Sequence, residues 1–197
     1  PEERAEMKKF SKLADAFTPL AKGMNSEYAN QNGYDCIQIH GGSGFMLEYA
    51  CQRIYRDARI TSIYEGTTQL QTVAAIRYVT NGFYSSVIED YAQMPVASEL
   101  ESVKARVAAM TEKFNHCVTL VKEAENQELH DLCARHLYEM AADIIMCYLL
   151  MQNASKAPEL FAQSLQVFAN HSEAEVAKHT SLIERMSAEQ VENYRQA

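Results

Sequence analysis

The sequence predicts an all-α protein built from two consecutive helical bundles. Only 7 glycines and 4 prolines interrupt 197 residues, and no glycine follows Gly82. Apolar residues recur every three or four positions through most of the chain, which is the spacing of one face of a helix. Because 47% of the residues are apolar, the chain can bury a substantial core.

The first helices should surround a glycine-rich break. Apolar residues at helical spacing predict a helix over 2–17, and Pro19 is expected to kink or restart it before a second helix over about 20–39. The cluster Gly41-Gly42-Ser43-Gly44 should end that helix in a loop.

A mixed stretch and a further helix complete the first part, residues 1–82. Residues 48–62 combine apolar side chains with Arg and Asp, and Gly66 should separate this stretch from the helical pattern that follows. Asn81-Gly82 has the composition of a helix C-terminus and should close that helix.

A linker over 83–97 should lead into a second, antiparallel bundle over 98–197. Ser98-x-x-Glu101 and Ser172-x-x-Glu175 have the form of capping boxes, which place helix starts at both serines. Three apolar stripes should then face one another. They are Val103, Val107, Met110, Phe114, Cys117 and Val121; Leu132, Leu137, Met140, Ile144, Ile145 and Tyr148; and Val176, Leu182 and Met186.

Charge and composition exclude several partners. A net charge of −8 and a pI near 5.3 argue against nucleic acid and anionic membrane surfaces. The longest apolar run, around 140–151, is too short and too polar to span a bilayer, so no membrane association is expected. Five cysteines without a CxxC spacing indicate reduced thiols and a cytoplasmic protein.

Residues 38–71 carry the chemistry. Missing side chains at Gly41 and Gly42 let backbone N–H groups approach an anion, although a plain helix-ending loop explains the same glycines. Tyr64-Glu65-Gly66-Thr67-Thr68 places a carboxylate beside an aromatic ring and a flexible residue, followed by two hydroxyls that can cap the next helix. Taken alone, Glu65 is better explained as a surface residue than as a base.

The order of motifs in this segment resembles the acyl-CoA dehydrogenase family. It runs Gln-x-x-Gly-Gly-x-Gly-Phe, Glu-Tyr, Arg-Asp-Ala-Arg-Ile and Ile-Tyr-Glu-Gly-Thr-x-x-Leu-Gln, and the likeness covers nearly all of residues 1–80. Many members have proline after the Glu-Tyr pair, where this sequence has Ala50. The resemblance implies the back part of that family's C-terminal four-helix bundle at 1–82, followed by an appended helical domain at 98–197.

The resemblance also implies an activity and a site. Glu65 would remove the α-proton of an acyl-CoA thioester while FAD accepts the β-hydride, giving trans-2-enoyl-CoA, with Tyr64 and Gly66 beside the substrate. Contacts to the FAD of the same subunit would come from Thr67, Thr68 and Gln69, and contacts to the FAD of a neighbouring subunit from Gln38, Ile39, His40, Gly41 and Gly42.

The same resemblance implies partners for a longer parent protein. The parent would be a homo-oligomer, dimer or tetramer, that passes electrons to an electron-transfer flavoprotein. The chain alone is expected to be inactive and not to retain FAD, because the family's other domains supply much of the flavin and substrate site.

Other functions fit the residues less well. A di-metal bundle normally shows Glu-x-x-His pairs, and none of the six histidines has glutamate three positions before it, so no metal site is expected. A nucleophilic hydrolase lacks its strand–turn–helix Ser or Cys. A non-catalytic helical interaction module derived from the family remains the alternative.

Overall fold

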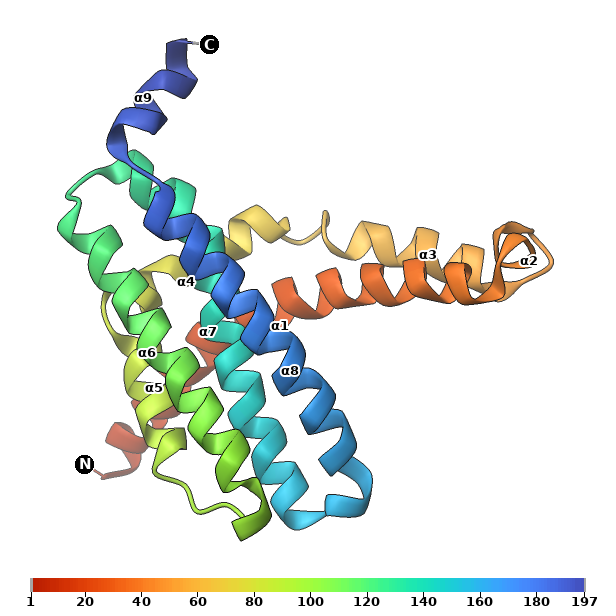
Figure 1. The fold of residues 1–197 in the computed structure, drawn as a ribbon, viewed down its shortest axis with the longest axis horizontal. Coiled ribbons are helices and arrows are strands. Elements are labelled where there is room, and N and C mark those ends of the chain that lie inside the picture. The colour runs from red at the N-terminus through yellow and green to blue at the C-terminus, as the bar shows by residue number, and fades with distance from the viewer. Residues whose placement is uncertain (1, 197) are drawn as a thin grey trace. The chain divides into compact units, whose positions relative to one another are not determined.

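The computed structural model describes residues 2–196, with side chains for 3–193. Every regular element in these residues is helical, which confirms the all-α prediction (Figure 1). The chain divides into two compact units, Pro1–Ala75 and Ile76–Ala197. All five cysteines are free thiols. Among the described residues, no helix combines the length and the apolar character that crossing a membrane requires.

The first unit is a helical hairpin that leads into a further helix. α1 (Glu2–His40) is followed by the short α2 (Gly42–Phe45), by α3 (Ala50–Thr61) and by α4 (Thr68–Thr80), whose last turns belong to the second unit. α3 runs back along α1, with α2 at the tip of the hairpin (Figure 1). Gly33 permits their close approach, because a Cβ at this position would lie 3.0 Å from Cα of Tyr55.

Pro19 does not break the first helix, and the predicted restart is wrong. α1 continues from residue 2 to residue 40 with Pro19 inside it. A proline within a helix costs about 3 kcal/mol because one backbone hydrogen bond is lost and the ring crowds the preceding turn. Ala16, Leu20 and Met24, on both sides of the proline, are buried along one face. Burial of this helix face therefore outweighs the tendency of Pro19 to break the helix.

The predicted glycine breaks are confirmed, but the loop predicted over 41–44 is wrong, because Gly42–Phe45 form the short helix α2. α1 ends at His40, and Gly41 adopts a φ of 60°. Gly66 lies between α3 and α4 with a φ of 96°. Gly82 follows the end of α4 with a φ of 78°, a left-handed conformation that glycine adopts without strain.

The second unit is an antiparallel helical bundle. It comprises α5 (Phe83–Ala92), a 3₁₀ turn (Ser98–Leu100), α6 (Glu101–Glu123), α7 (Gln127–Lys156), α8 (Pro158–Arg185) and α9 (Ala188–Gln196). Consecutive long helices α6, α7 and α8 run in opposite directions and pack against one another (Figure 1). Residues 83–97, expected as a linker, contain α5, whose Tyr84, Val87 and Ile88 are buried.

The predicted stripes are confirmed in α6 and in most of α7. All six positions named for α6 are buried, as are Leu137, Met140, Ile144, Ile145 and Tyr148 of α7. Three predicted core positions are wrong. Leu132 and Leu182 are 41% and 40% exposed, and Met186 lies beyond the end of α8. In α8 the adjacent residue Ile183 is buried instead, so the buried face is rotated by one position from the prediction.

Both predicted capping boxes are wrong. Ser98 begins a 3₁₀ turn in which the N–H of Leu100 bonds to the carbonyl of Ala97, and α6 starts later without a side-chain cap. Ser172 is buried in the middle of α8. Other side chains cap helices in this unit. Oδ1 of Asn126 accepts a 2.9 Å hydrogen bond from the N–H of Leu129 at the start of α7, and Ser187 and Gln190 form a capping box at the start of α9.

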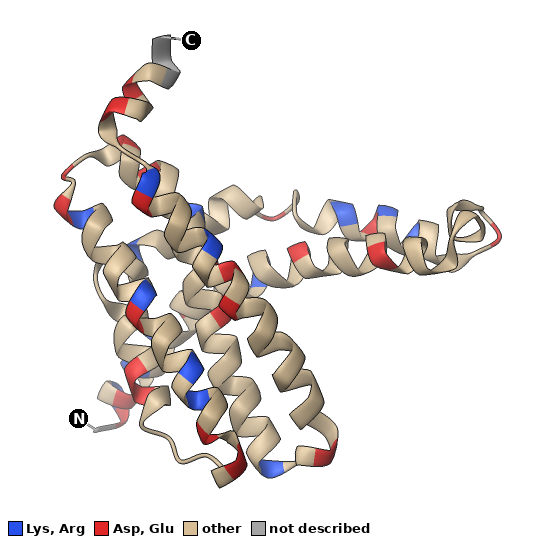
Figure 2. Ribbon diagram, viewed as in Figure 1, with Lys and Arg blue, Asp and Glu red and all other residues tan. Residues whose placement is uncertain are grey.

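Residues of both charges are interspersed along the helices of the second unit (Figure 2). Arg106 of α6 donates to Glu173 of α8 at 2.6 Å and to Asn170 at 2.8 Å. His179 of α8 is buried, with Nε2 3.2 Å from Oε2 of Glu139 and Nδ1 2.9 Å from Nδ1 of His136, both on α7. Polar contacts therefore fix the register of α8 against both of its neighbours.

We expect Ala50→Pro to raise the melting temperature. Ala50 is the first residue of α3, and Tyr49 before it has an extended backbone with φ −103° and ψ 139°, which suits a residue preceding proline. A compatible proline stabilises by about 0.4–1 kcal/mol because the unfolded chain loses freedom. Thermal unfolding followed by circular dichroism provides the measurement. Ala58→Pro, inside the same helix, is the control and should destabilise by about 3 kcal/mol.

Stability should fall as the pH drops below about 6.5. Burial and the nearby His179, with further contributions from Lys178 and Arg135, lower the pKa of His136, although Glu139 opposes them. Since the folded pKa lies below the unfolded value of 6.5, the unfolded chain takes up the proton first and becomes favoured.

Melting temperatures measured from pH 8 to pH 5 test this dependence. Burial would raise the pKa of Glu139, but hydrogen bonds from His179 and Arg135 outweigh it and lower this pKa. The stability that the ionised Glu139 contributes to the folded state is therefore lost only at more acidic pH. His136→Gln should flatten the curve between pH 7 and pH 5. An unchanged slope in that variant would assign the dependence to another group.

Candidate functional site

The predicted site residues lie in two places within the first unit. Gln38, Ile39, His40, Gly41 and Gly42 lie at the end of α1 and the start of α2, while Tyr64, Glu65, Gly66, Thr67, Thr68 and Gln69 span the turn between α3 and α4. The 12 residues of α3 separate the two groups by about 18 Å. The structure does not bring them together.

The turn between α3 and α4 holds Glu65 in an unusual conformation. Glu65 has a φ of 50°, one of only two positive values among the described residues other than glycine. Gly66 follows with a φ of 96°, and a Cβ there would lie 2.6 Å from Nε2 of Gln71. A left-handed conformation costs a residue with a Cβ on the order of 1–2 kcal/mol, so the surrounding contacts must hold Glu65 in place.

Lys22 of α1 supplies the strongest of these contacts. Its ammonium group donates to the carbonyl of Thr61 at 2.7 Å and to the carbonyl of Gly66 at 2.6 Å. The same ammonium lies 5.8 Å from the centroid of the Tyr64 ring. Nε2 of Gln71 adds a 3.2 Å hydrogen bond to the carbonyl of Gly66. One charged side chain therefore ties α1 to both ends of the turn.

The turn leaves three consecutive backbone donors available. In the part of the chain that the structure describes, the N–H groups of Glu65, Gly66 and Thr67 donate to no protein acceptor. Successive N–H groups at left-handed positions form a concave donor set that suits an anion or a carbonyl oxygen. The Glu65 side chain is exposed beside them. The turn therefore combines an exposed glutamate side chain with backbone N–H groups that have no protein acceptor.

Thr67 and Thr68 begin α4 in different ways. Oγ1 of Thr67 accepts a 3.2 Å hydrogen bond from the N–H of Leu70, which confirms the predicted cap. Thr68 is buried and donates to a carboxylate oxygen of Glu27 on α1 at 2.6 Å. Gln69 is exposed. The buried Thr68 hydroxyl therefore links α4 to α1 within this unit.

The glycine turn presents a different surface. Gln38, His40, Gly41 and Gly42 are exposed, and Ile39 is 84% exposed. Just beyond them, Phe45 is 78% and Leu47 is 84% exposed. Apolar side chains this exposed commonly mark a surface that another chain or ligand covers.

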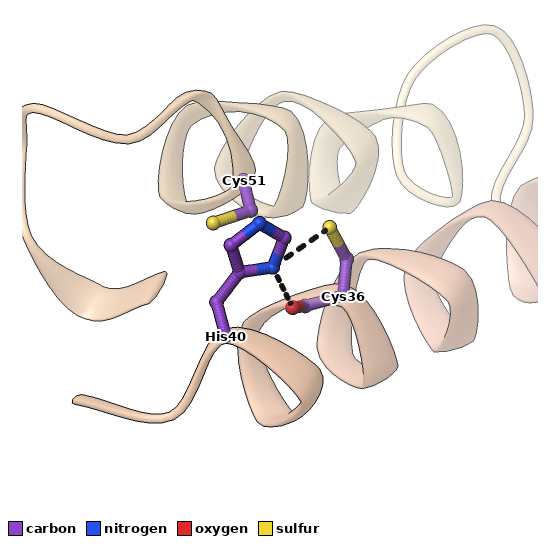
Figure 3. Close-up of side chains that lie close together, drawn as sticks. All are labelled: Cys36, His40 and Cys51. Atoms are coloured by element: carbon purple, nitrogen blue, oxygen red, sulfur yellow. Dashed lines mark hydrogen bonds between the residues drawn. The ribbon is translucent and has the colours of Figure 1, made fainter. Parts of the chain in front are cut away.

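A second group of functional side chains lies beside the glycine turn and was missed by the sequence reasoning. Cys36 and His40 of α1 and Cys51 of α3 place one ligand atom each within 4.8 Å of the others (Figure 3). The i,i+4 spacing of Cys36 and His40 was a usable signal. Cys51 gave no signal, because only the pairing of α1 with α3 brings it close.

The structure also shows cavities away from these residues. One, of about 290 Å³, lies in the second unit and is lined by Leu120, Val121, Leu129, Cys133 and Ile183 among others. A shallower one of about 270 Å³ is lined by Met146, Leu149, Leu150, Asn153 and Phe168. No predicted site residue lines either cavity.

Two family models together match nearly all of the chain. The model described as "Acyl-CoA dehydrogenase, C-terminal domain" matches residues 2–79, and the model described as "Acyl-CoA dehydrogenase C terminal" matches residues 80–191.

Curated relatives match over smaller portions. The long-chain specific acyl-CoA dehydrogenase of Sus scrofa mitochondria is 40% identical over 70 residues, which are 36% of this chain and 16% of that protein. The 3-methylmercaptopropionyl-CoA dehydrogenase of Ruegeria pomeroyi is 38% identical over 112 residues, 55% of this chain and 18% of that protein. The chain thus spans less than a fifth of the length of these relatives.

Two solved structures are similar in fold. An acyl-CoA dehydrogenase family protein from Porphyromonas gingivalis matches 57% of this chain and 97% of its own, with 36% identity and a TM-score of 0.54. An acyl-CoA dehydrogenase from Bacillus anthracis, complexed with FAD, matches 90% of this chain and 34% of its own. Its TM-score is 0.67, and at 21% identity it bears on the fold alone.

We expect Lys22→Met to loosen the turn that carries Glu65. The variant keeps the aliphatic stem and loses both hydrogen bonds to the carbonyls of Thr61 and Gly66. A charge-assisted contact of this kind contributes about 1–3 kcal/mol. Amide hydrogen exchange should accelerate over residues 61–68, and the melting temperature should fall. Lys9→Met, at an exposed lysine of the same helix, is the matched control. Equal exchange rates and melting temperatures in the two variants would show that Lys22 does not hold the turn.

Proposed function

This chain belongs to the acyl-CoA dehydrogenase family of FAD-dependent dehydrogenases, and we propose that in the whole protein it supplies the catalytic base for oxidation of acyl-CoA to trans-2-enoyl-CoA. Glu65 is the proposed base. The observation that carries the proposal is the α3–α4 turn, which combines the exposed Glu65 side chain with the N–H groups of residues 65–67 that have no protein acceptor.

Oxidation of an acyl-CoA needs both a carboxylate base and nearby hydrogen-bond donors. The α-proton of a thioester is weakly acidic, so its removal requires stabilisation of the negative charge that develops on the thioester oxygen. In the proposed arrangement the Glu65 carboxylate takes the proton, and its own N–H donates to that oxygen. Gly66 leaves room for the thioester, and Tyr64 lies against the substrate.

Glu65 is exposed in this chain, so the parts of the whole protein outside it must supply the cover. Covering a carboxylate removes water from it and makes it a stronger base. This requirement agrees with the proposal that the chain alone is inactive. In agreement with this, Glu65 lines neither of the two cavities described above.

The residues fit a flavin at two separate surfaces. When bound, FAD would accept the β-hydride of the substrate. We propose that Thr67, Thr68 and Gln69 contact the FAD of the same subunit, and that Gln38, Ile39, His40, Gly41 and Gly42 contact the FAD of a neighbour. The free N–H groups at residues 65–67 and the open space around Gly41 and Gly42 accommodate such contacts.

We propose that the whole protein is a homo-oligomer that transfers its electrons to an electron-transfer flavoprotein. The exposed apolar side chains of Ile39, Phe45 and Leu47 support an assembly surface at the glycine turn. Their position supports a neighbouring subunit as the occupant, since the turn lies about 18 Å along α3 from Glu65.

Glu65→Gln in the whole FAD-loaded protein tests the proposal. The amide keeps the size of the side chain and removes the base, so flavin bleaching by acyl-CoA should slow by roughly 10²–10⁴-fold. Stopped-flow absorbance with a panel of acyl-CoAs measures the rate and identifies the preferred acyl group. Glu123→Gln, an exposed carboxylate on α6, is the matched control.

The outcomes separate the candidate functions. Both variants must retain FAD for the comparison to count. Equal bleaching in Glu65→Gln and in the unmodified protein would exclude Glu65 as the base. A whole protein that neither binds FAD nor bleaches would favour the non-catalytic interaction module.

A further inference from the structure

Two thiols and an imidazole converge where α1 and α3 pair. Cys36 and His40 lie one turn apart near the end of α1, and Cys51 lies in the first turn of α3 (Figure 3). One ligand atom from each of the three side chains lies within 4.8 Å of the ligand atoms of the other two. Cys51 is buried, Cys36 is partly buried and His40 is exposed.

These separations are close to those of a metal-bound set. With Zn–S near 2.3 Å and Zn–N near 2.0 Å, two sulfurs on a tetrahedral zinc lie about 3.8 Å apart and a sulfur and a nitrogen about 3.6 Å apart. Atoms up to 4.8 Å apart therefore need to close by up to about 1.2 Å, a change that side-chain rotation can supply.

We propose that Cys36, His40 and Cys51 form a Zn²⁺ site. Two thiolates and one imidazole are a soft ligand set that selects zinc over magnesium or calcium. Three protein ligands leave a fourth tetrahedral position for a water molecule or another ligand. The bound ion joins α1 to α3 beside the glycine turn.

A neighbouring backbone group already orients the imidazole. Nδ1 of His40 donates to the carbonyl of Cys36 at 2.8 Å, which leaves the lone pair of the ring on Nε2. Metal-binding histidines commonly hold their second nitrogen in this way. The Cys51 thiol donates to the carbonyl of Gly44 at 3.2 Å, and this hydrogen bond is given up when the thiolate binds metal.

Proton release should make the binding pH-dependent. Zinc binds thiolates and neutral imidazole, so each cysteine thiol must lose its proton as the metal binds. Zinc affinity should therefore increase as the pH rises from 6 to 8.

Cobalt and zinc titrations of the 197-residue chain test the site. The chain is first stripped of metal with a chelator and kept reduced with a phosphine, because thiol reductants bind zinc. Co²⁺ should give a thiolate-to-metal charge-transfer absorption, and competition with a chromophoric chelator should show one tightly bound Zn²⁺ per chain. Zinc should also raise the melting temperature.

Variants assign the ligands. Cys36→Ser and Cys51→Ser should each weaken zinc binding by more than about 100-fold, since each removes a direct ligand, and the double variant should lose the charge-transfer absorption. Serine at position 51 can still donate to the carbonyl of Gly44, and circular dichroism checks that each variant folds. Cys133→Ser, a buried thiol of α7, is the matched control and should leave binding unchanged.

The readout excludes other zinc ligands and is independent of the flavin proposal. A site built on His136, His179 and Glu139 contains no sulfur and gives no thiolate absorption. Absence of that absorption, or its persistence in the double variant, would overturn the zinc site. Because the titration uses neither FAD nor acyl-CoA, its failure leaves the role of Glu65 untouched.

Discussion

The contact between the ammonium of Lys22 and the carbonyls of Thr61 and Gly66 organises the first unit. The turn between α3 and α4 forms few backbone hydrogen bonds of its own and contains two consecutive residues with positive φ. Left alone, such a segment would sample many conformations. A single cation from α1 draws the end of α3 and the start of α4 to one point. The direction of Glu65 therefore depends on a residue more than forty positions away in the sequence.

Features governed by neighbouring residues were predictable from the sequence. The α6 stripe from Val103 to Val121 and the stop at Gly82 follow from periodicity and from the conformational freedom of glycine. Pro19 and Ser172 were misjudged because burial of one helix face outweighed their local preferences. Lys22 and Cys51 could not be found, since their contacts exist only once α1 and α3 pair. Motif order still located Glu65 and the glycine turn, which no periodicity would have selected.

The length of α3 explains why the proposed flavin contacts form two groups. A rigid helix of 12 residues holds the glycine turn away from the Glu65 turn. Groups at its two ends cannot converge on one small ligand within the same unit, so they serve either distant parts of a large cofactor or different molecules. The zinc site proposed at Cys36, His40 and Cys51 lies at the glycine-turn end of this hairpin. A metal bound there would stiffen the part of the hairpin that Lys22 does not reach.

The φ of 50° at Glu65 has a consequence for engineering the protein. Glycine would occupy this position without the steric cost that a Cβ imposes, and asparagine would do so at lower cost than glutamate. Any procedure that ranks substitutions by thermostability alone will therefore favour replacing Glu65. A thermostable library built in that way would discard the proposed base while every structural assay improved. Position 65 should be held fixed before such a search begins.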